Sequence, residues 1–369
     1  MKIFLSAGDP SGDLHGSNLI KEIKRQKPDT EFFGFGGHLM AQYAEMLDPL
    51  AENSIIGFWE PVKNLSRLFK DINNAKRFFK NSKPDCVILI DYYGFNIHLA
   101  AAAKKFGIPV IYYISPQVWA TRKSRVYEIK KCVDKVFVIF PFENEIYQKA
   151  GVDCEFLGHP LLDIIPALLQ HKKNSAPNIG IMPGSRIQEI KRHFDVFMES
   201  FRIIKRSFPC SRIIMPVFSA EQKKYITGNF QFDVSKVDFV EHNDYQKRSQ
   251  MDICITSSGT ATVENMILGV PMVIGYRTSA LTYFIAKNLI KIKNIGMVNI
   301  LAKETVCMEL IQDEMTPKSV SEECLKLLQN KEYCGAIKQK LKSVTGKLGM
   351  PGSTKKVAQK ILEVLKPEF

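Results

Sequence analysis

The sequence predicts an α/β fold made of two Rossmann-like, doubly wound parallel-sheet domains that face a cleft. Short apolar stretches recur along the chain without polar alternation, which is typical of strands buried on both faces. Helical patterns separate these stretches, as the crossover connections of a parallel sheet require. The 369 residues also exceed the roughly 250 at which a single core stops growing, so two domains are expected.

The first domain, predicted for residues 1–165, repeats a strand–helix order. Its first strand leads into a glycine-rich turn and then a helix whose apolar positions lie three and four residues apart. The predicted strands are 2–6, 86–90, 110–114 and 135–140.

The second domain, predicted for residues 178–345, follows a linker-like stretch with prolines, lysines and small polar residues. From Thr316 onward the pattern is helical only. The last helical segment, 346–369, could close this domain, cross back to the first one, or cross to a second subunit of a homodimer. The predicted strands are 178–182, 212–218, 238–242, 252–256 and 271–277.

Composition narrows the class of protein. Lys and Arg outnumber Asp and Glu by 51 to 38, and this favours an anionic partner such as a phosphorylated substrate, an anionic lipid surface or a nucleic acid. The eight cysteines form no CxxC pair and are expected to be reduced. The N-terminus lacks a signal-peptide pattern, so a cytoplasmic protein is expected.

Two strand ends carry turns suited to an anion. At PGSRIQE the backbone of Gly184 and Ser185 can approach a ligand, and Arg186 offers a charged fork at a helix start. At SSGTATVE, residues Ser257, Ser258, Gly259 and Thr260 provide N–H and hydroxyl donors, and Glu264 could accept hydrogen bonds from a ribose. The alternatives are an ordinary helix capped by Ser185 and a capped helix with a solvated glutamate.

Two features of the first domain complete the candidate site. Asp91 directly follows the strand 86–90 and could be a general base or cap the helix that starts near Asn96. The loop AGDPSGDLHG, with Gly8, Gly12 and Asp13, fits a sugar or phosphate, or is simple turn chemistry. No Asp-x-Asp, GxGxxG or GxxxxGK[ST] pattern is present, which argues against a metal-clamped diphosphate, a dehydrogenase and an NTPase.

Two segments, 55–79 and 279–294, combine aromatic, apolar and basic residues in an amphipathic pattern. Such segments lie on membrane surfaces, although each apolar face could also be ordinary core. No stretch has the length of a membrane span.

The motifs AGDPSGD, FGFGG, IDYYGFN, SPQVWATR, PFE, GHP, PGSRIQE, SSGTATVE and GYR occur in an order that resembles lipid-A-disaccharide synthases. The resemblance spans residues 3 to about 300 and implies the two-domain GT-B glycosyltransferase architecture. It implies transfer of 2,3-diacylglucosamine from its UDP conjugate to the 6-hydroxyl of 2,3-diacylglucosamine 1-phosphate (lipid X). The implied reaction inverts the anomeric centre, needs no cofactor or metal, involves no nucleic acid, and takes place on the cytoplasmic face of the inner membrane.

The resemblance also implies roles for the domains and for single residues. The domain of residues 1–165 would bind the acceptor and face the membrane, and that of residues 178–345 would bind the UDP-sugar. Asp91 would take the acceptor proton, Arg186 would stabilise the departing diphosphate, and Glu264 would contact the ribose. Further substrate-binding positions implied in the same way are Gly8, Ser11, Gly12, Asp13, Gly184, Ser185, Glu189, Ser257, Ser258, Gly259, Thr260, Tyr276, Arg277 and Asn299.

The sequence departs from the family pattern at two positions. Gly94 stands where relatives usually have a second aspartate, and Asp9 stands where they have glutamate. The acceptor side is therefore less firmly implied than the UDP side. The competing hypotheses are a related UDP-sugar enzyme, such as a UDP-N-acetylglucosamine 2-epimerase, and a non-catalytic basic protein that binds lipid or nucleic acid.

Overall fold

The computed structural model of the chain describes residues 1–49, 61–119, 124–167, 176–279, 283 and 294–365. The chain forms two compact units, which we treat separately. Unit 1 comprises Met1–Asp163 together with Leu348–Phe369, and unit 2 comprises Ile164–Lys347.

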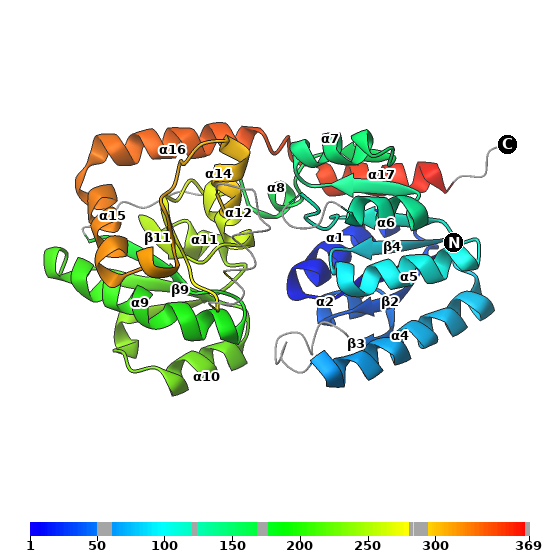
Figure 1. Ribbon diagram of the computed structural model, residues 1–369, viewed down its shortest axis with the longest axis horizontal. Helices are drawn as coiled ribbons and strands as arrows, with labels where there is room; N and C mark the ends of the chain where they lie inside the picture. Colours follow the sequence, from blue (N-terminus) through cyan, green and yellow to red (C-terminus); the bar gives the residue numbers. More distant parts are fainter. Residues whose placement is uncertain (50–60, 120–123, 168–175, 280–282, 284–293, 366–369) are drawn as a thin grey trace. The chain divides into compact units, whose positions relative to one another are not determined.

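Within the described ranges, unit 1 contains a seven-stranded sheet in the order β3-β2-β1-β4-β5-β6-β7, and every adjacent pair is parallel (Figure 1). The strands are β1 (Lys2–Ala7), β2 (Glu31–Gly36), β3 (Glu45–Pro49), β4 (Cys86–Ile90), β5 (Val110–Tyr113), β6 (Lys135–Val138) and β7 (Cys154–Phe156). The helices are α1 (Pro10–Gln26), α2 (His38–Ala41), α4 (Pro61–Ser82), α5 (Tyr93–Lys105), α6 (Arg125–Cys132), α7 (Pro141–Lys149), α8 (Leu161–Ile164) and α17 (Ser353–Val364).

Both faces of this sheet are buried, which explains the apolar strands. Along β4, Val87 and Leu89 join one core cluster with Phe79 of α4. Cys86, Ile88 and Ile90 of the same strand join the other cluster, which includes residues of α1 and α17. A strand covered by helices on both sides has no polar face, so its sequence CVILI shows no alternation.

Helix α17 belongs to unit 1 although it follows all of unit 2 in the sequence. It packs against α1, and its residues Val357, Ala358 and Ile361 are buried in the core cluster of that face (Figure 1). The carboxylate of Asp163 holds its first turn by accepting N–H groups from Gly352 at 2.5 Å and Thr354 at 2.8 Å. The apolar face of α17 is thus covered within its own chain.

Unit 2 contains, in the part that the structure describes, a six-stranded parallel sheet in the order β10-β9-β8-β11-β12-β13. The strands are β8 (Asn178–Met182), β9 (Arg212–Val217), β10 (Val237–Glu241), β11 (Ile253–Thr256), β12 (Met272–Tyr276) and β13 (Glu309–Ile311). The helices are α9 (Ile187–Ser207), α10 (Ala220–Asn229), α11 (Tyr245–Arg248), α12 (Thr260–Ile267), α14 (Met297–Ala302), α15 (Pro317–Gln329) and α16 (Lys331–Gly346), with short 3-10 turns at Val234–Lys236 and Gln312–Glu314.

The predicted fold class, two parallel-sheet α/β domains, is confirmed. In each unit the strand order reverses beside its first strand, β1 or β8, which has later strands on both sides. Ligands of such sheets bind at the carboxyl ends of the strands next to this reversal, and the candidate residues lie there.

Candidate active site

The turn after β8 is shaped by Gly184. Its φ of 132° lies in a region that favours glycine, and a Cβ there would come within 2.5 Å of the Glu189 side chain. The Glu189 carboxylate accepts the N–H groups of Ser185 at 3.1 Å and Arg186 at 3.4 Å. Glu189 therefore supports the turn, while the Arg186 side chain at the N-cap of α9 is 65% exposed and accessible to a ligand. The alternative with Ser185 as N-cap is wrong.

The turn after β11 lies beside it, because Met182 of β8 and Thr256 of β11 are register partners. Gly259 is the N-cap of α12 and is exposed, and a Cβ at this position would have no atom of the described residues within 4 Å. Thr260 is also exposed, and Ser258 donates to the Ile295 carbonyl at 2.9 Å. The helices α9 and α12 thus begin at neighbouring strand ends, and the first N–H groups of a helix suit an anion.

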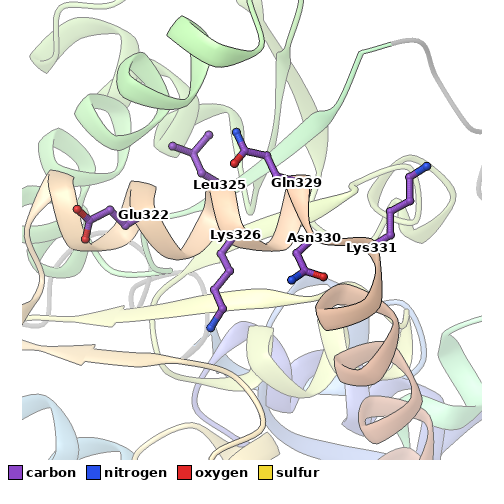
Figure 2. Close-up of a pocket in the computed structure, with 6 residues that line it drawn as sticks. All are labelled: Glu322, Leu325, Lys326, Gln329, Asn330 and Lys331. Atoms are coloured by element: carbon purple, nitrogen blue, oxygen red, sulfur yellow. The ribbon is translucent and has the colours of Figure 1, made fainter.

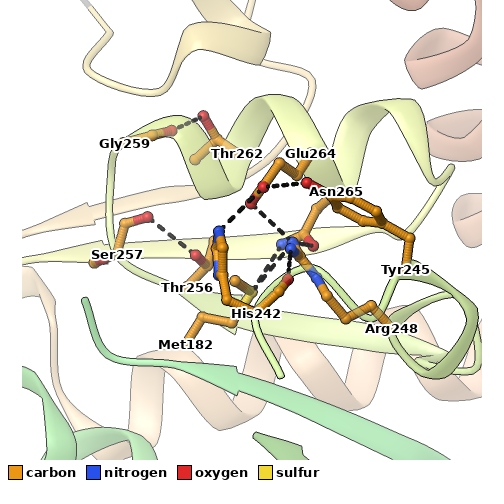
Figure 3. Close-up of polar contacts among 10 residues, drawn as sticks. All are labelled: Met182, His242, Tyr245, Arg248, Thr256, Ser257, Gly259, Thr262, Glu264 and Asn265. Atoms are coloured by element: carbon orange, nitrogen blue, oxygen red, sulfur yellow. Dashed lines mark hydrogen bonds and ion pairs between the residues drawn. The ribbon is translucent and has the colours of Figure 1, made fainter. Parts of the chain in front are cut away.

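Glu264 lies behind this turn, inside unit 2 (Figure 3). Its side chain is 2% exposed, so the alternative of a solvated glutamate is wrong. One carboxylate oxygen accepts from the Tyr245 hydroxyl at 2.9 Å and lies 3.1 Å from His242 Nε2, and the other lies 3.0 Å from Arg248 Nη2. Both oxygens already have protein partners, which a ribose hydroxyl would have to share.

The charge of Glu264 follows from these neighbours. Burial favours the neutral acid, but Arg248 and His242 outweigh it and hold the pKa of the carboxyl well below its usual range. The ionised pair with fully buried Arg248 fixes α12 relative to α11. Removing one partner would leave a buried unpaired charge.

Three further predicted residues of unit 2, Tyr276, Arg277 and Asn299, are partly or fully buried. Arg277 donates to the carbonyl of Met315 at 2.8 Å, while Tyr276 is half-buried beside it. Asn299 is fully buried: its amide donates to the Cys307 carbonyl at 2.7 Å and to Glu309 Oε1 at 2.6 Å, and its oxygen accepts from the Cys307 N–H at 2.9 Å. These contacts order the chain before β13.

Asp91 follows β4 in unit 1, next to Gly8, because Ala7 and Ile90 are register partners. Asp91 is exposed, and its φ of 44° is strained for a residue with a side chain. Its carbonyl accepts from Asn96 Nδ2 at 2.8 Å and from the Tyr112 hydroxyl at 2.5 Å. Strained backbone held by buried partners is typical of functional sites. Sequence reasoning missed both partners, since it treated Asn96 as a helix start, whereas α5 begins at Tyr93.

The loop after β1 has structural reasons for its composition. A Cβ on Gly8 would lie 2.2 Å from the Tyr92 ring, so Gly8 is needed for that ring to pack. Gly12 donates its N–H to Asp9, the N-cap of α1, at 2.6 Å, and Ser11 is half-buried in the first turn. Asp13 is buried and accepts the N–H groups at the start of α2, from Gly37 at 2.8 Å and Leu39 and Met40 at 3.0 Å.

The departure at Gly94 leaves room at the start of α5. Among the described residues, no atom lies within 4 Å of the Cβ that a larger residue would have there. A second acidic side chain is nevertheless present in unit 1: Glu143 of α7 is buried, and its Oε1 accepts from Trp119 Nε1 at 2.9 Å. Glu143 belongs to the PFE motif, but nothing in the local sequence indicates that it is buried.

A different part of unit 2 contains an open hollow of about 690 Å³, over α15 and the start of α16 (Figure 2). Its lining offers no convergent set of polar groups, and it lies away from the turns described above. The lining residues are Glu322, Leu325, Lys326, Gln329, Asn330 and Lys331.

Within the described ranges, His, Cys, Asp and Glu side chains form no group of three that could hold a metal ion. In the same ranges, no helix is both long and apolar enough to span a bilayer. Of the two predicted membrane-surface patterns, residues 55–60, 280–282 and 284–293 lie outside the described residues.

The two parallel-sheet α/β units have the two-domain GT-B architecture. Solved structures share the fold: UDP-GlcNAc 2-epimerase from Neisseria meningitidis, bound to UDP-GlcNAc, has a TM-score of 0.65 at 13% identity over 98% of this chain and 100% of that one. MurG from Acinetobacter baumannii has a TM-score of 0.60 at 14% identity, over 98% of this chain and 99% of that one.

Sequence comparison identifies the family. The family model described as lipid-A-disaccharide synthetase matches residues 3–363. Lipid-A-disaccharide synthase from Geobacter metallireducens is 39% identical over 99% of this chain and 97% of its own, and that from Syntrophus aciditrophicus is 35% identical over 99% and 98%. The chain therefore belongs to the lipid-A-disaccharide synthase family and is a glycosyltransferase; the epimerase and binding-protein hypotheses are not favoured.

Proposed function

We propose that this protein joins UDP-2,3-diacylglucosamine to lipid X and releases UDP and a β-1,6-linked disaccharide 1-phosphate. Family membership over nearly the whole chain supports the reaction. Binding of the UDP donor is supported by the pair of adjacent turns after β8 and β11, where two helix N-termini and Arg186 suit a diphosphate.

On this proposal Asp91 removes the proton from the acceptor 6-hydroxyl while that oxygen attacks the anomeric carbon. The bond to the UDP oxygen breaks in the same displacement, so one base is sufficient and the anomeric configuration inverts. Exposure of Asp91 at the end of β4 and the strained backbone around it support this role.

The negative charge that develops on the departing UDP needs stabilisation. The proposed groups are Arg186 and the N–H groups at the starts of α9 and α12. They belong to unit 2, whereas the proposed base belongs to unit 1.

Both proposed substrates carry acyl chains, so we propose peripheral association with the cytoplasmic face of the inner membrane. Helix α4 supports this: its Phe69 is 62% exposed, and the exposed residues Lys70, Lys76, Arg77 and Lys80 lie on the same helix.

The test incubates the purified protein with UDP-2,3-diacylglucosamine and lipid X in mild detergent with EDTA. Mass spectrometry should find UDP and disaccharide phosphate in equal amounts. A folded protein that makes neither product would overturn the proposal, and conversion of free UDP-N-acetylglucosamine to its 2-epimer would establish the epimerase instead.

The base is tested by Asp91→Asn, which keeps the shape and removes the proton acceptor. Turnover should fall by about 10³-fold or more, while the Kd for UDP stays within about twofold. Asp29→Asn, at an exposed aspartate between α1 and β2, is the matched control and should keep full turnover. Equal turnover of Asp91→Asn and wild type would remove the base role.

A further inference from the structure

A histidine on α9 connects the two strand ends that flank β11. His193 is fully buried; its Nδ1 lies 2.7 Å from the Pro183 carbonyl oxygen, and its Nε2 lies 3.0 Å from the Arg277 backbone nitrogen. Pro183 follows β8 and Arg277 follows β12, and the sheet order places β11 between those strands. One imidazole therefore links both neighbours of the strand that ends in the Ser257–Thr260 turn.

The partners determine the protonation state of the ring. A carbonyl oxygen only accepts, so Nδ1 must carry a proton to bond Pro183. Nε2 lies 3.0 Å from the Arg277 N–H, which only donates, and 3.1 Å from the Arg277 carbonyl oxygen, which only accepts. When Nδ1 carries the single proton of a neutral ring, Nε2 accepts the Arg277 N–H. Burial lowers the pKa of His193 and outweighs the backbone hydrogen bonds with Pro183 and Arg277 and the charge of Glu189, all of which act in the opposite direction. The neutral Nδ1–H form is thus the one that satisfies both strand ends.

The turn after β8 has two further supports. Gln222 of α10 donates to the Gly184 carbonyl at 3.1 Å, and Glu189 holds the next two N–H groups. His193 holds Pro183, the residue before Gly184, and it also contacts Arg277 at the end of β12. If the imidazole is lost, the turn keeps its other anchors but is no longer tied to Arg277.

We propose that His193 is a positioning residue for the UDP diphosphate: without touching the ligand, its neutral imidazole holds the Pro183–Arg186 turn in register with the end of β12. This inference rests on the proposed function, since it requires that turn to bind the diphosphate.

A purely packing role predicts a different outcome. His193 stacks on Phe197 with ring centroids 5.8 Å apart and lies 5.5 Å from the Tyr276 ring. His193→Phe retains an aromatic ring in this stack and removes both hydrogen bonds. Phe197→Leu disturbs the same stack and leaves both hydrogen bonds in place, so it is the matched control.

The experiment measures UDP binding by calorimetry, the KM of each substrate, and the melting temperature. His193→Phe should raise the Kd for UDP and the donor KM by about tenfold, because it loses hydrogen bonds whose net contribution corresponds to such a change. The KM for lipid X should stay unchanged. His193→Asn, whose amide can reach Pro183 only, should lie between wild type and His193→Phe. Phe197→Leu should lower the melting temperature but keep the Kd within about twofold.

Equal UDP affinity in wild type and His193→Phe, or equal weakening in His193→Phe and Phe197→Leu, would overturn the positioning role. A wild-type protein that does not bind UDP would overturn the proposed donor site itself, so the two failures are distinguishable. A second measurement tests the protonation state of the ring in the wild-type protein. NMR of protein labelled with ¹⁵N-histidine should show a protonated Nδ1 and an unprotonated Nε2 at neutral pH. Loss of the signal in His193→Asn assigns it to His193. The opposite tautomer would contradict the proposal.

Discussion

Glu143 is a carboxylic acid that is almost entirely enclosed by unit 1. Burial raises its pKa to about 8, even though hydrogen bonds from Trp119 and the Phe140 backbone act in the opposite direction. The nearby charge of Asp91 adds to the increase. Near neutral pH the folded protein therefore keeps a proton on Glu143, whereas the unfolded chain releases it.

This difference predicts how stability depends on pH. Between the usual pKa of 4.5 and the folded value of about 8, the folded state binds more protons than the unfolded state, so the free energy of unfolding falls as pH rises. Glu143→Gln cannot titrate and should have a flatter profile. The stability of wild type relative to the variant should therefore fall from about pH 5 to about pH 8, as chemical denaturation at several pH values can measure.

The matched control is Glu145→Gln, at a glutamate of the same helix whose side chain is 73% exposed. Its profile should run parallel to that of wild type. A Glu143→Gln profile that also runs parallel would mean that the buried carboxyl ionises in the folded protein at the usual pH.

Residues that act through distant partners were the least predictable from sequence. The motifs PGSRIQE and SSGTATVE located both turns, because glycines and hydroxyls after a strand are local signals. Their supports were not visible: His193 meets Arg277 only after the chain returns through β12, and Glu264 meets Arg248 across two elements. An apolar helix pattern with one histidine gives no indication of such a contact.

Among the elements, α4 presents two contrasting faces. Ala75 and Phe79 are fully buried, and the Phe79 ring lies 5.1 Å from that of Phe4 in β1. Phe69 lies on the opposite, exposed side among basic residues. The core interpretation of this helix therefore holds for Ala75 and Phe79, while the membrane-surface interpretation stays a prediction for Phe69.

The exposed side gives a prediction for membrane binding. Phe69→Ser should weaken binding to anionic phosphatidylglycerol vesicles roughly tenfold, the effect of withdrawing most of one aromatic side chain from lipid. Co-sedimentation measures it. Tyr127→Ser on α6 is the matched control because Tyr127 is 61% exposed, against 62% for Phe69, and it should change binding less than twofold. Equal losses in both variants, or no binding by wild type, would contradict the membrane proposal.

The sequence predicted the strands that are continuously apolar. It did not predict the strands that are recognisable only by their hydrogen bonds to a neighbouring strand. The strands β7 and β13 have three residues each, and β3 has the sequence EMLDP; none was predicted. Strand β2, EFFGFG, was noted only as a glycine motif. Its Gly34 is needed because a Cβ would lie 1.8 Å from the Leu5 carbonyl oxygen of β1, a contact that local sequence does not reveal.

At the scale of the whole molecule, Asp163 secures the return of the chain to unit 1. Asp163→Ala removes the acceptor for the first N–H groups of α17 and should lower the stability of unit 1 by about 1–2 kcal/mol. Tryptophan fluorescence during urea unfolding can follow this, since both tryptophans, Trp59 and Trp119, fall within residues 1–163.

Thr316→Ala is the matched control, because Thr316 caps α15 of unit 2 by accepting the Ser319 N–H at 3.1 Å. It should leave the tryptophan transition unchanged while circular dichroism records a loss of stability elsewhere. A tryptophan transition that moves equally in both variants would show that the two units unfold together.

The return of α17 also sets an order of events during protein synthesis. The ribosome completes residues 1–163 first, but Val357, Ala358 and Ile361 emerge only after all of unit 2. Unit 2 is continuous in the sequence and can fold as it emerges, while the α17-binding face of α1 stays open to water and to chaperones. The unit that is translated first is therefore the last to be finished, and nascent chains that stop before residue 348 carry an uncovered apolar surface.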